Sequence, residues 1–178
     1  MLIRGPCDGK TAGKGIRRHT ETHCLYGRQS GRREDTLGRV RQFRSEDIEK
    51  ILEIEADAFP KTAYPKELLL VYASRLAESF LVFEAEAAVV AYIIYNSEGH
   101  IISMAVSPSH RRKGIATELF RHALEKSESV WLEVRSRNYG AIRFYESMGM
   151  RAVGKVEEYY DGDDALIMIS NEKMETRA

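Results

Sequence analysis

Large apolar residues are distributed unevenly along the chain, and their spacing predicts where ordered structure begins. Over residues 1–38 they follow neither the period of a strand nor that of a helix, and Gly, Arg, Ser and Thr are frequent. Such a segment cannot bury enough apolar surface to offset the entropy lost on ordering. We therefore predict that residues 1–38 form a disordered N-terminal extension and that the fold begins near Val40.

After Val40 the apolar spacing changes repeatedly between the period of strands and the period of helices. Ser45 is predicted to cap the first helix, Pro60 to end it and Pro65 to open the second. The resulting order, β-α-α-β-β-β-α-β-α-β-β, is typical of a mixed sheet with helices on its faces. Strands are predicted at 40–43, 80–84, 89–95, 101–106, 130–135, 153–159 and 165–170, and helices at 46–59, 65–76, 114–126 and 141–148.

Charge divides the chain at nearly the same place. The 27 Lys and Arg residues balance the 27 Asp and Glu residues overall, but residues 1–44 carry 11 of the former and 4 of the latter. The first segment thus has a net charge of +7 and the remainder −7. Two interpretations remain open: a solvated basic tail on a mildly acidic domain, or a tail that makes weak contact with RNA or the ribosome.

The two cysteines, Cys7 and Cys24, both lie in the predicted extension. His19, His23 and Cys24 are close in sequence, but their spacing matches no standard zinc pattern, so no metal site is predicted. The chain has no membrane-spanning apolar run and no signal-peptide core, which favours a cytoplasmic protein that does not enter a membrane. A cysteine acyl-enzyme within the folded part is excluded, because no Cys follows position 24.

The predicted strand–turn–helix at 102–117 carries the clearest candidate chemistry. The N-terminus of a helix presents free N–H groups and the positive end of the helix dipole, which suit a phosphate. Gly114 lets a ligand approach the backbone closely, and Arg111, Arg112 and Lys113 add positive charge. A basic helix start with a tightly packed glycine has the same pattern, so these residues alone do not decide between the two interpretations.

This segment resembles the acetyl-CoA motif of the GNAT acetyltransferases, (Q/R)-x-x-G-x-(G/A), which is filled here by Arg111, Gly114 and Ala116. The family also places a strand that ends in V-x-P just before the motif, and Val106 and Pro108 match it. Both matches fall within the same predicted strand–turn–helix. The resemblance therefore favours a phosphate-binding role for the turn.

A second resemblance lies further along the chain. Residues 132–135 spell L-E-V-R, Asn138 follows, and residues 141–150 fit the pattern A-x-x-x-Y-x-x-x-G with Met where Phe is usual. At this spacing the pattern is similar to that of RimI-type protein N-terminal acetyltransferases. Together the two resemblances cover roughly residues 39–170.

The resemblance implies a GNAT fold of the α/β (α+β) class: a mixed, mostly antiparallel central sheet of about seven strands, flanked by about four helices. The corresponding domain is expected at residues 39–172, between the extension and a C-terminal tail at 173–178. As a family, these proteins transfer an acetyl group from acetyl-CoA to an amine, which makes acetyl-CoA the expected donor. The sequence does not distinguish a monomer from a homodimer.

The resemblance also implies residues that hold acetyl-CoA. Met104, Ala105 and Val106 would offer backbone groups to its acetyl and pantetheine parts, and Asn138 would lie near the pantetheine arm. The residues implied at the pyrophosphate end are Arg111, Arg112, Lys113, Gly114, Ile115, Ala116 and Thr117.

Glu133 matches the general base of RimI-type enzymes and Tyr145 their general acid. An α-amine has a pKa of about 7.7–8.0, so a carboxylate needs to remove only one proton, and a tyrosine can protonate the departing thiolate. Each residue also has a structural interpretation. Glu133 alternates with Leu132 and Val134 as the polar residue of a strand, and Tyr145 occupies an apolar position of its helix.

Fold alone does not fix the acceptor. The loop with Phe59, Pro60 and Tyr64 has the position at which N-terminal acetyltransferases shape the pocket for the first residue, and Tyr159 and Tyr160 would bracket a peptide backbone. We therefore predict transfer to the N-terminal α-amine of a protein, such as a ribosomal protein. The alternatives are a small amine, a lysine side chain, or a non-catalytic module that binds acetyl-CoA.

The acceptor loop departs from the RimI-type pattern at one position. Lys61 stands where an aromatic residue usually follows the proline. The first-residue preference is therefore left open by the sequence.

Overall fold

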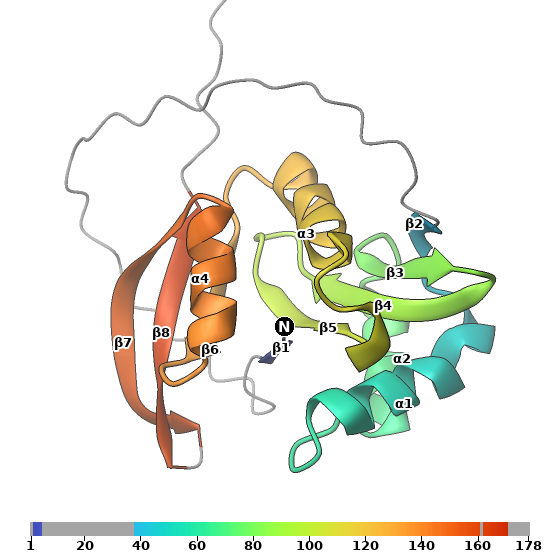
Figure 1. Cartoon of the computed structure of the whole chain (residues 1–178), viewed down its shortest axis with the longest axis horizontal. Coiled ribbons are helices and arrows are strands. Elements are labelled where there is room, and N and C mark those ends of the chain that lie inside the picture. The colour runs from blue at the N-terminus through green and yellow to red at the C-terminus, as the bar shows by residue number, and fades with distance from the viewer. Residues whose placement is uncertain (1, 5–37, 161, 171–178) are drawn as a thin grey trace, which may run out of the picture.

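The computed structural model describes residues 2–4, 38–160 and 162–170, which form eight strands, four α-helices and two 3₁₀ helices (Figure 1). The strands are β1 (Leu2–Arg4), β2 (Gly38–Gln42), β3 (Phe80–Ala85), β4 (Ala88–Tyr95), β5 (Ile101–Val106), β6 (Trp131–Arg135), β7 (Met150–Tyr160) and β8 (Asp163–Ser170). The helices are η1 (Ser45–Asp47), α1 (Ile48–Ala58), α2 (Lys66–Arg75), η2 (Pro108–His110), α3 (Ile115–Lys126) and α4 (Tyr139–Ser147).

The strands divide between two antiparallel sheets. The first has the order β1-β5-β4-β3-β2 and the second the order β6-β8-β7. Helices α1 and α2 cover one face of the first sheet, whereas α3 lies on its other face, towards α4 and the second sheet (Figure 1). The predicted fold class is thereby confirmed.

Both faces of the first sheet are buried. In β3, successive side chains pack alternately against the two faces. Leu81 and Phe83 pack into a cluster with α3, α4 and the second sheet. Phe80 and Val82 point to the opposite face and pack against α1 and α2. Successive side chains of a strand face opposite sides, so the nearly continuous apolar run of β3 is what a sheet covered on both faces requires.

One β-bridge connects the two sheets within the described residues. His100, just before β5, forms a parallel bridge with Trp131 at the start of β6, and Trp131 N donates to Gly99 O at 3.0 Å. Gly99 has φ +76°, and a Cβ there would lie 1.9 Å from Ser129 O. Only glycine permits this close approach, so Gly99 fixes where the two sheets touch.

Beyond this junction the outer edge of β5 is paired with β1 instead of β6. Leu2 lies opposite Ala105, Ile3 opposite Met104, and Arg4 opposite Ser103. This strand differs from the prediction, because Leu2–Arg4 belongs to the segment expected to lack structure. Strand pairing uses backbone groups and needs no apolar pattern, which is why the composition of the segment gave no sign of it. Of the predicted extension, residues 1 and 5–37, including Cys7, Cys24, His19 and His23, lie outside the described residues, as do residues 171–178, whereas Gly38 already belongs to β2.

The start of the first helix also differs from the prediction. Ser45 does not cap it; instead the Asp47 carboxylate accepts from Arg44 N at 2.7 Å and from the Arg41 guanidinium at 2.7 and 2.8 Å. A bidentate hydrogen bond between charged groups is stronger than a hydrogen bond to a serine hydroxyl. The helical segment therefore begins with the 3₁₀ turn η1, which is held by the contacts of Asp47. Pro65 does precede α2, as predicted.

None of the helices in the described ranges is both long and apolar enough to span a membrane. Within the same residues, no three His, Cys, Asp or Glu side chains are grouped so that they could hold a metal ion.

Candidate active site

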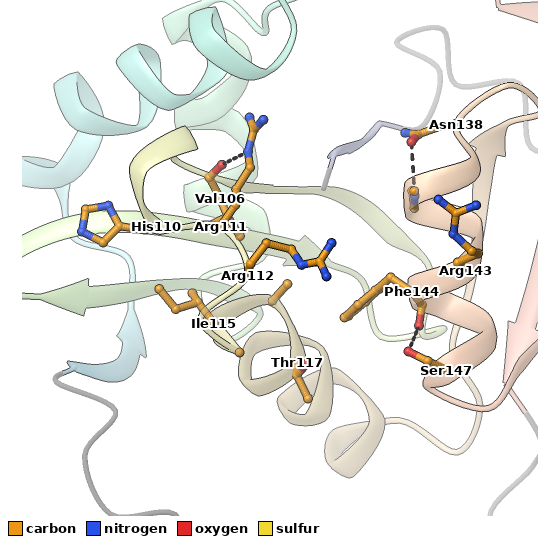
Figure 2. A pocket seen from close by; sticks show the side chains of 14 residues that line it. Val106, His110, Arg111, Arg112, Ile115, Thr117, Asn138, Arg143, Phe144 and Ser147 are labelled. Carbon is orange, nitrogen blue, oxygen red and sulfur yellow. Dashed lines mark hydrogen bonds between the residues drawn. The ribbon is translucent and has the colours of Figure 1, made fainter.

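A pocket of about 730 Å³ lies between the start of α3 and the facing side of α4 (Figure 2). Eight residues expected to bind the donor line it: Val106, Arg111, Arg112, Gly114, Ile115, Ala116, Thr117 and Asn138. Six other residues complete the lining: His110, Gly140, Ala141, Arg143, Phe144 and Ser147. Lys113, Met104 and Ala105, which were also expected at the donor site, are not part of this lining.

The turn before α3 has a backbone suited to an anion. Gly114 is the N-cap residue with φ +84°, and a Cβ built on it would meet nothing within 4 Å. Arg112 also has a positive φ, +65°. The first N–H groups of α3 have no partner within the helix, so they remain available on the side where the pocket opens. The turn thus combines open space, free donors and the positive end of the helix dipole.

The arginines around the pocket have different roles. Arg111 Nε donates to Val106 O at 3.0 Å, which turns this side chain back onto the end of β5. In Figure 2 Arg112 extends instead towards Phe144, and Arg143 projects from α4. Sequence reasoning missed Arg143. Gly140, Arg143, Phe144 and Ser147 share one face of α4 at helical spacing, and this periodicity is the signal that could have identified it.

Asn138 serves the local fold as well as the pocket. Its side-chain oxygen accepts from Ala141 N at 3.2 Å and so caps α4. The residue also lines the pocket, with its side chain at the N-terminal end of α4 (Figure 2).

Glu133 lies at the centre of a second cluster, at the junction of the two sheets. Its side chain is only 9% exposed. His100 Nε2 lies 2.7 Å from Glu133 Oε2, and Tyr159 OH donates to Glu133 Oε1 at 3.0 Å. Tyr160 OH donates to the backbone oxygen of Glu133 at 3.2 Å. The structure therefore brings together three residues that the sequence assigned to base and acceptor roles, and it adds His100.

His100 is held rigidly in this cluster. Its ring stacks on Trp131 with centroids 3.9 Å apart and planes at 9°, and its backbone N–H donates to the Asn96 side chain. His100 was not singled out from the sequence. Its contact with Glu133 depends on the parallel bridge between His100 and Trp131, which are 31 positions apart, and no local sequence pattern predicts such a pairing.

Tyr145 combines a core position with an unpaired polar atom. Its ring is fully buried and packs against Phe120 and Phe144 at 5.4 and 5.1 Å between centroids. Within the described residues its hydroxyl has no hydrogen-bond partner. Burial, with a smaller contribution from the neighbouring Tyr160, raises the pKa of Tyr145 well above its ordinary value. At neutral pH the hydroxyl therefore keeps its proton and is available as a donor.

The expected acceptor residues fall into two groups. Tyr159 and Tyr160 lie on β7 in a perpendicular arrangement, and the Arg135 guanidinium lies 4.3 Å from the Tyr160 ring centroid. In the loop between α1 and α2, Phe59 is half-buried, Pro60 is exposed and Tyr64 is buried. The loop and the β7–β8 turn appear at the same lower edge of Figure 1.

Strand β5 connects the pocket with the Glu133 cluster. His100 stands immediately before its first residue, and Val106 at its end lines the pocket. At about 3.3 Å per residue the two ends are about 20 Å apart. An extended molecule that follows the edge of β5 would therefore have one end at the cationic turn and the other end beside Glu133.

Known proteins resemble this chain in sequence and in fold. A model of the acetyltransferase (GNAT) family matches residues 48–150. The N-alpha-acetyltransferase of Sulfurisphaera tokodaii is 32% identical over 152 residues, which cover 73% of this chain and 90% of that protein. The ribosomal protein bS18-alanine N-acetyltransferase of Escherichia coli K12 is 31% identical over 131 residues, which cover 66% and 84% respectively.

Among solved structures, Ard1 from Thermoplasma volcanium matches with a TM-score of 0.67 and 31% identity, covering 75% of this chain and 97% of that one. Family model, relatives and fold agree with the resemblance read from the sequence, and they make this chain an N-acetyltransferase that depends on acetyl-CoA. The chain belongs to the GNAT family of acetyltransferases.

Proposed function

We propose that this protein transfers the acetyl group of acetyl-CoA to the N-terminal α-amine of a protein or peptide. The observation that carries the proposal is the Glu133 carboxylate, held between His100 and Tyr159 at one end of β5, while the other end of β5 opens into a cationic pocket. The names of the relatives from S. tokodaii and E. coli support an α-amine acceptor. A ribosomal protein is the acceptor class that the E. coli relative suggests.

The pocket fits the phosphates of acetyl-CoA. Gly114 leaves its outer side open, the first turn of α3 supplies N–H donors, and Arg112 and Arg143 supply charge. The protonated Tyr145 hydroxyl, which has no hydrogen-bond partner among the described residues, could donate to an acceptor such as a thioester or thiolate sulfur. When bound, acetyl-CoA supplies an activated acyl group and a thiolate that can leave.

Glu133 is the proposed proton acceptor for the attacking amine. An ionised carboxylate has about four lone-pair sites. Each oxygen of Glu133 can therefore accept a further hydrogen bond in addition to the one with His100 or Tyr159. A proton that reaches Glu133 is shared with the His100 imidazole 2.7 Å away before it passes to solvent. Tyr159 holds the other carboxylate oxygen and thereby fixes the orientation of the base.

The remaining steps use β5 and Tyr145. Backbone groups at Met104, Ala105 and Val106 are proposed to bind the extended part of the donor, and an N–H there would stabilise negative charge on the carbonyl oxygen. Tyr145 is proposed to give its proton to the departing sulfur. The weak contact with RNA or the ribosome expected of residues 1–44 stays a prediction, since most of that segment lies outside the described residues.

Acetyl transfer to defined amines tests the proposal. The substrates are short peptides with a free N-terminus, the same peptides with a blocked N-terminus and one internal lysine, and a polyamine. We expect acetyl-CoA-dependent transfer to the free N-termini, with the product mapped to the α-nitrogen by mass spectrometry. Transfer to the blocked, lysine-containing peptides or to the polyamine, and not to free N-termini, would contradict it.

A further inference from the structure

Glu55 on α1 is a carboxylate for which the proposed reaction has no use, although the residue is completely buried. A buried carboxylate costs several kcal/mol unless hydrogen bonds replace its lost hydration. Glu55 Oε2 accepts from Tyr64 N at 2.7 Å, and Glu55 Oε1 accepts from the Tyr92 hydroxyl. The side chain is therefore committed to specific partners on two other elements.

One of these bonds closes the loop proposed to contact the acceptor. Phe59 N donates to the backbone oxygen of Glu55 at 2.7 Å, and Tyr64 N donates to its side chain at the same distance. The two ends of the loop at 59–64 are thus attached to a single residue of α1. The intervening residues 60–63 are exposed. The position of the exposed segment 60–63 therefore depends on the hydrogen bonds that Glu55 accepts at both ends of the loop.

The other bond leads from the loop to β5. The Tyr92 hydroxyl on β4 lies 2.8 Å from Ser103 Oγ, and Ser103 is fully buried. Ser103 immediately precedes Met104, the first of the residues proposed to hold the donor. Glu55, Tyr92 and Ser103 therefore form a buried polar connection between the acceptor loop and the donor strand.

A second buried carboxylate, that of Asp47, has contacts that serve only the local fold, and it can be compared with Glu55. Its partners are Arg41 and the backbone of Arg44, which tie η1 to β2 at the opposite end of α1 from the loop at 59–64. The bonds of Asp47 hold η1 against β2, whereas the three bonds of Glu55 described above lead to the loop at 59–64 and, through Tyr92, to β5. The comparison supplies a matched control for the experiments below.

We propose that Glu55 is a positioning residue for acceptor recognition, which sets the loop at 59–64 relative to β5 and so determines how tightly and selectively the first residue of the acceptor binds. The proposal rests on the proposed function, because that function assigns the first-residue pocket to this loop. Glu55 does not touch the reacting atoms. Its removal should therefore change acceptor binding more than the chemical step.

The test compares Glu55→Gln, Glu55→Leu and Tyr92→Phe with Asp47→Asn as the control, at a temperature where each variant is folded by circular dichroism. We measure KM and kcat for peptides that differ only in their first residue, together with acetyl-CoA affinity. For Glu55→Leu we expect peptide KM to rise about tenfold, which corresponds to the loss of about 1.4 kcal/mol. The spread of kcat/KM among first residues should narrow, while kcat and acetyl-CoA affinity stay within about threefold.

The peptide KM of Glu55→Gln should lie between those of the wild type and Glu55→Leu. The amide oxygen of Gln can still accept from Tyr64 N, but its NH₂ group is a donor and cannot accept from the Tyr92 hydroxyl. Tyr92→Phe should have a smaller effect than Glu55→Leu, since it removes the hydroxyl that contacts Glu55 Oε1 and Ser103 Oγ but keeps the bond from Tyr64 N that closes the loop. Asp47→Asn should lower the melting temperature without changing KM or selectivity. Glu55 variants that behave like this control would overturn the proposal.

Amide hydrogen exchange separates failure of this proposal from failure of the proposed function. Glu55→Leu should accelerate exchange at Tyr64 N more than exchange within α1, whatever the acceptor is. Accelerated exchange with unchanged selectivity contradicts the role in recognition. If the wild-type protein transfers nothing to peptide N-termini, the proposed function fails, and the recognition proposal, which rests on it, fails with it.

Discussion

The pocket between α3 and α4 and the Glu133 cluster are built in opposite ways. The pocket uses residues from two short stretches, in which backbone geometry and helical spacing place most of the lining. The Glu133 cluster uses His100 from just before β5, Glu133 from β6 and two tyrosines from β7, and only strand pairing brings them together. The proposed phosphate site is thus defined by residues close in sequence, whereas the proposed proton transfers depend on tertiary structure.

If the Glu133 cluster carries the proton transfers and the pocket binds the donor, the largest loss of activity is expected for Glu133→Gln. This substitution removes the carboxylate charge and keeps the shape of the side chain. We expect kcat to fall by roughly 10²–10⁴-fold, the usual scale for a positioned acid–base group, while acetyl-CoA affinity changes little. Steady-state kinetics and calorimetry measure the two quantities. Glu157→Gln, on the exposed side of β7, is the control. Wild-type turnover in Glu133→Gln would show that the base lies elsewhere.

Tyr145→Phe should produce a loss of kcat on a similar or smaller scale, and it separates the two interpretations of this tyrosine. The ring remains to fill the core, and a buried hydroxyl without a described partner is removed, so stability should be unchanged or slightly higher. Activity and thermal unfolding are measured on the same preparation. A lower melting temperature together with normal turnover would mark Tyr145 as a core residue alone.

Gly114→Ala tests the pocket without touching the Glu133 cluster. The added Cβ would enter the open side of the turn, and we expect acetyl-CoA to bind about 10–100-fold more weakly by calorimetry. Gly149→Ala is a matched control, because Gly149 also has φ +84° and open space around a Cβ, but it lies outside the pocket. Both variants carry the strain of a positive φ, about 1–2 kcal/mol. Equal affinity in the two variants would refute the assignment of the turn.

These regions differ in how far the sequence could predict them. The strand at 101–106 and the end of α3 at Lys126 match the structure, because strong periodicity and clear breakers define them. Eight of the residues expected to bind the donor line the pocket, because they belong to short segments whose conformation is set by residues close in sequence. His100 was missed because its role follows from a pairing between strands. The cap at Asp47 was missed because its partner, Arg41, lies on a neighbouring strand.

The smallest predicted effect concerns Asp47, away from both regions. Burial raises the pKa of Asp47, but hydrogen bonds from Arg41 and Arg44 outweigh this, so the pKa lies below its ordinary value of 3.8. A carboxyl group with a lowered pKa stabilises the fold above its unfolded pKa and loses that contribution as the pH falls. We expect Asp47→Asn to cost about 1–3 kcal/mol at pH 7. Denaturant titrations should show this difference shrinking below about pH 4.

Strand β1 has a consequence for how readily the donor binds. It pairs with Met104 and Ala105, the same edge of β5 proposed to receive the extended part of acetyl-CoA. Only one segment can pair with that edge, so we expect β1 and the donor, bound as proposed, to compete for it. In such a competition the apparent dissociation constant equals the intrinsic one divided by the fraction of molecules whose edge is open. We therefore expect Leu2–Arg4 to raise the donor concentration at which the enzyme becomes occupied.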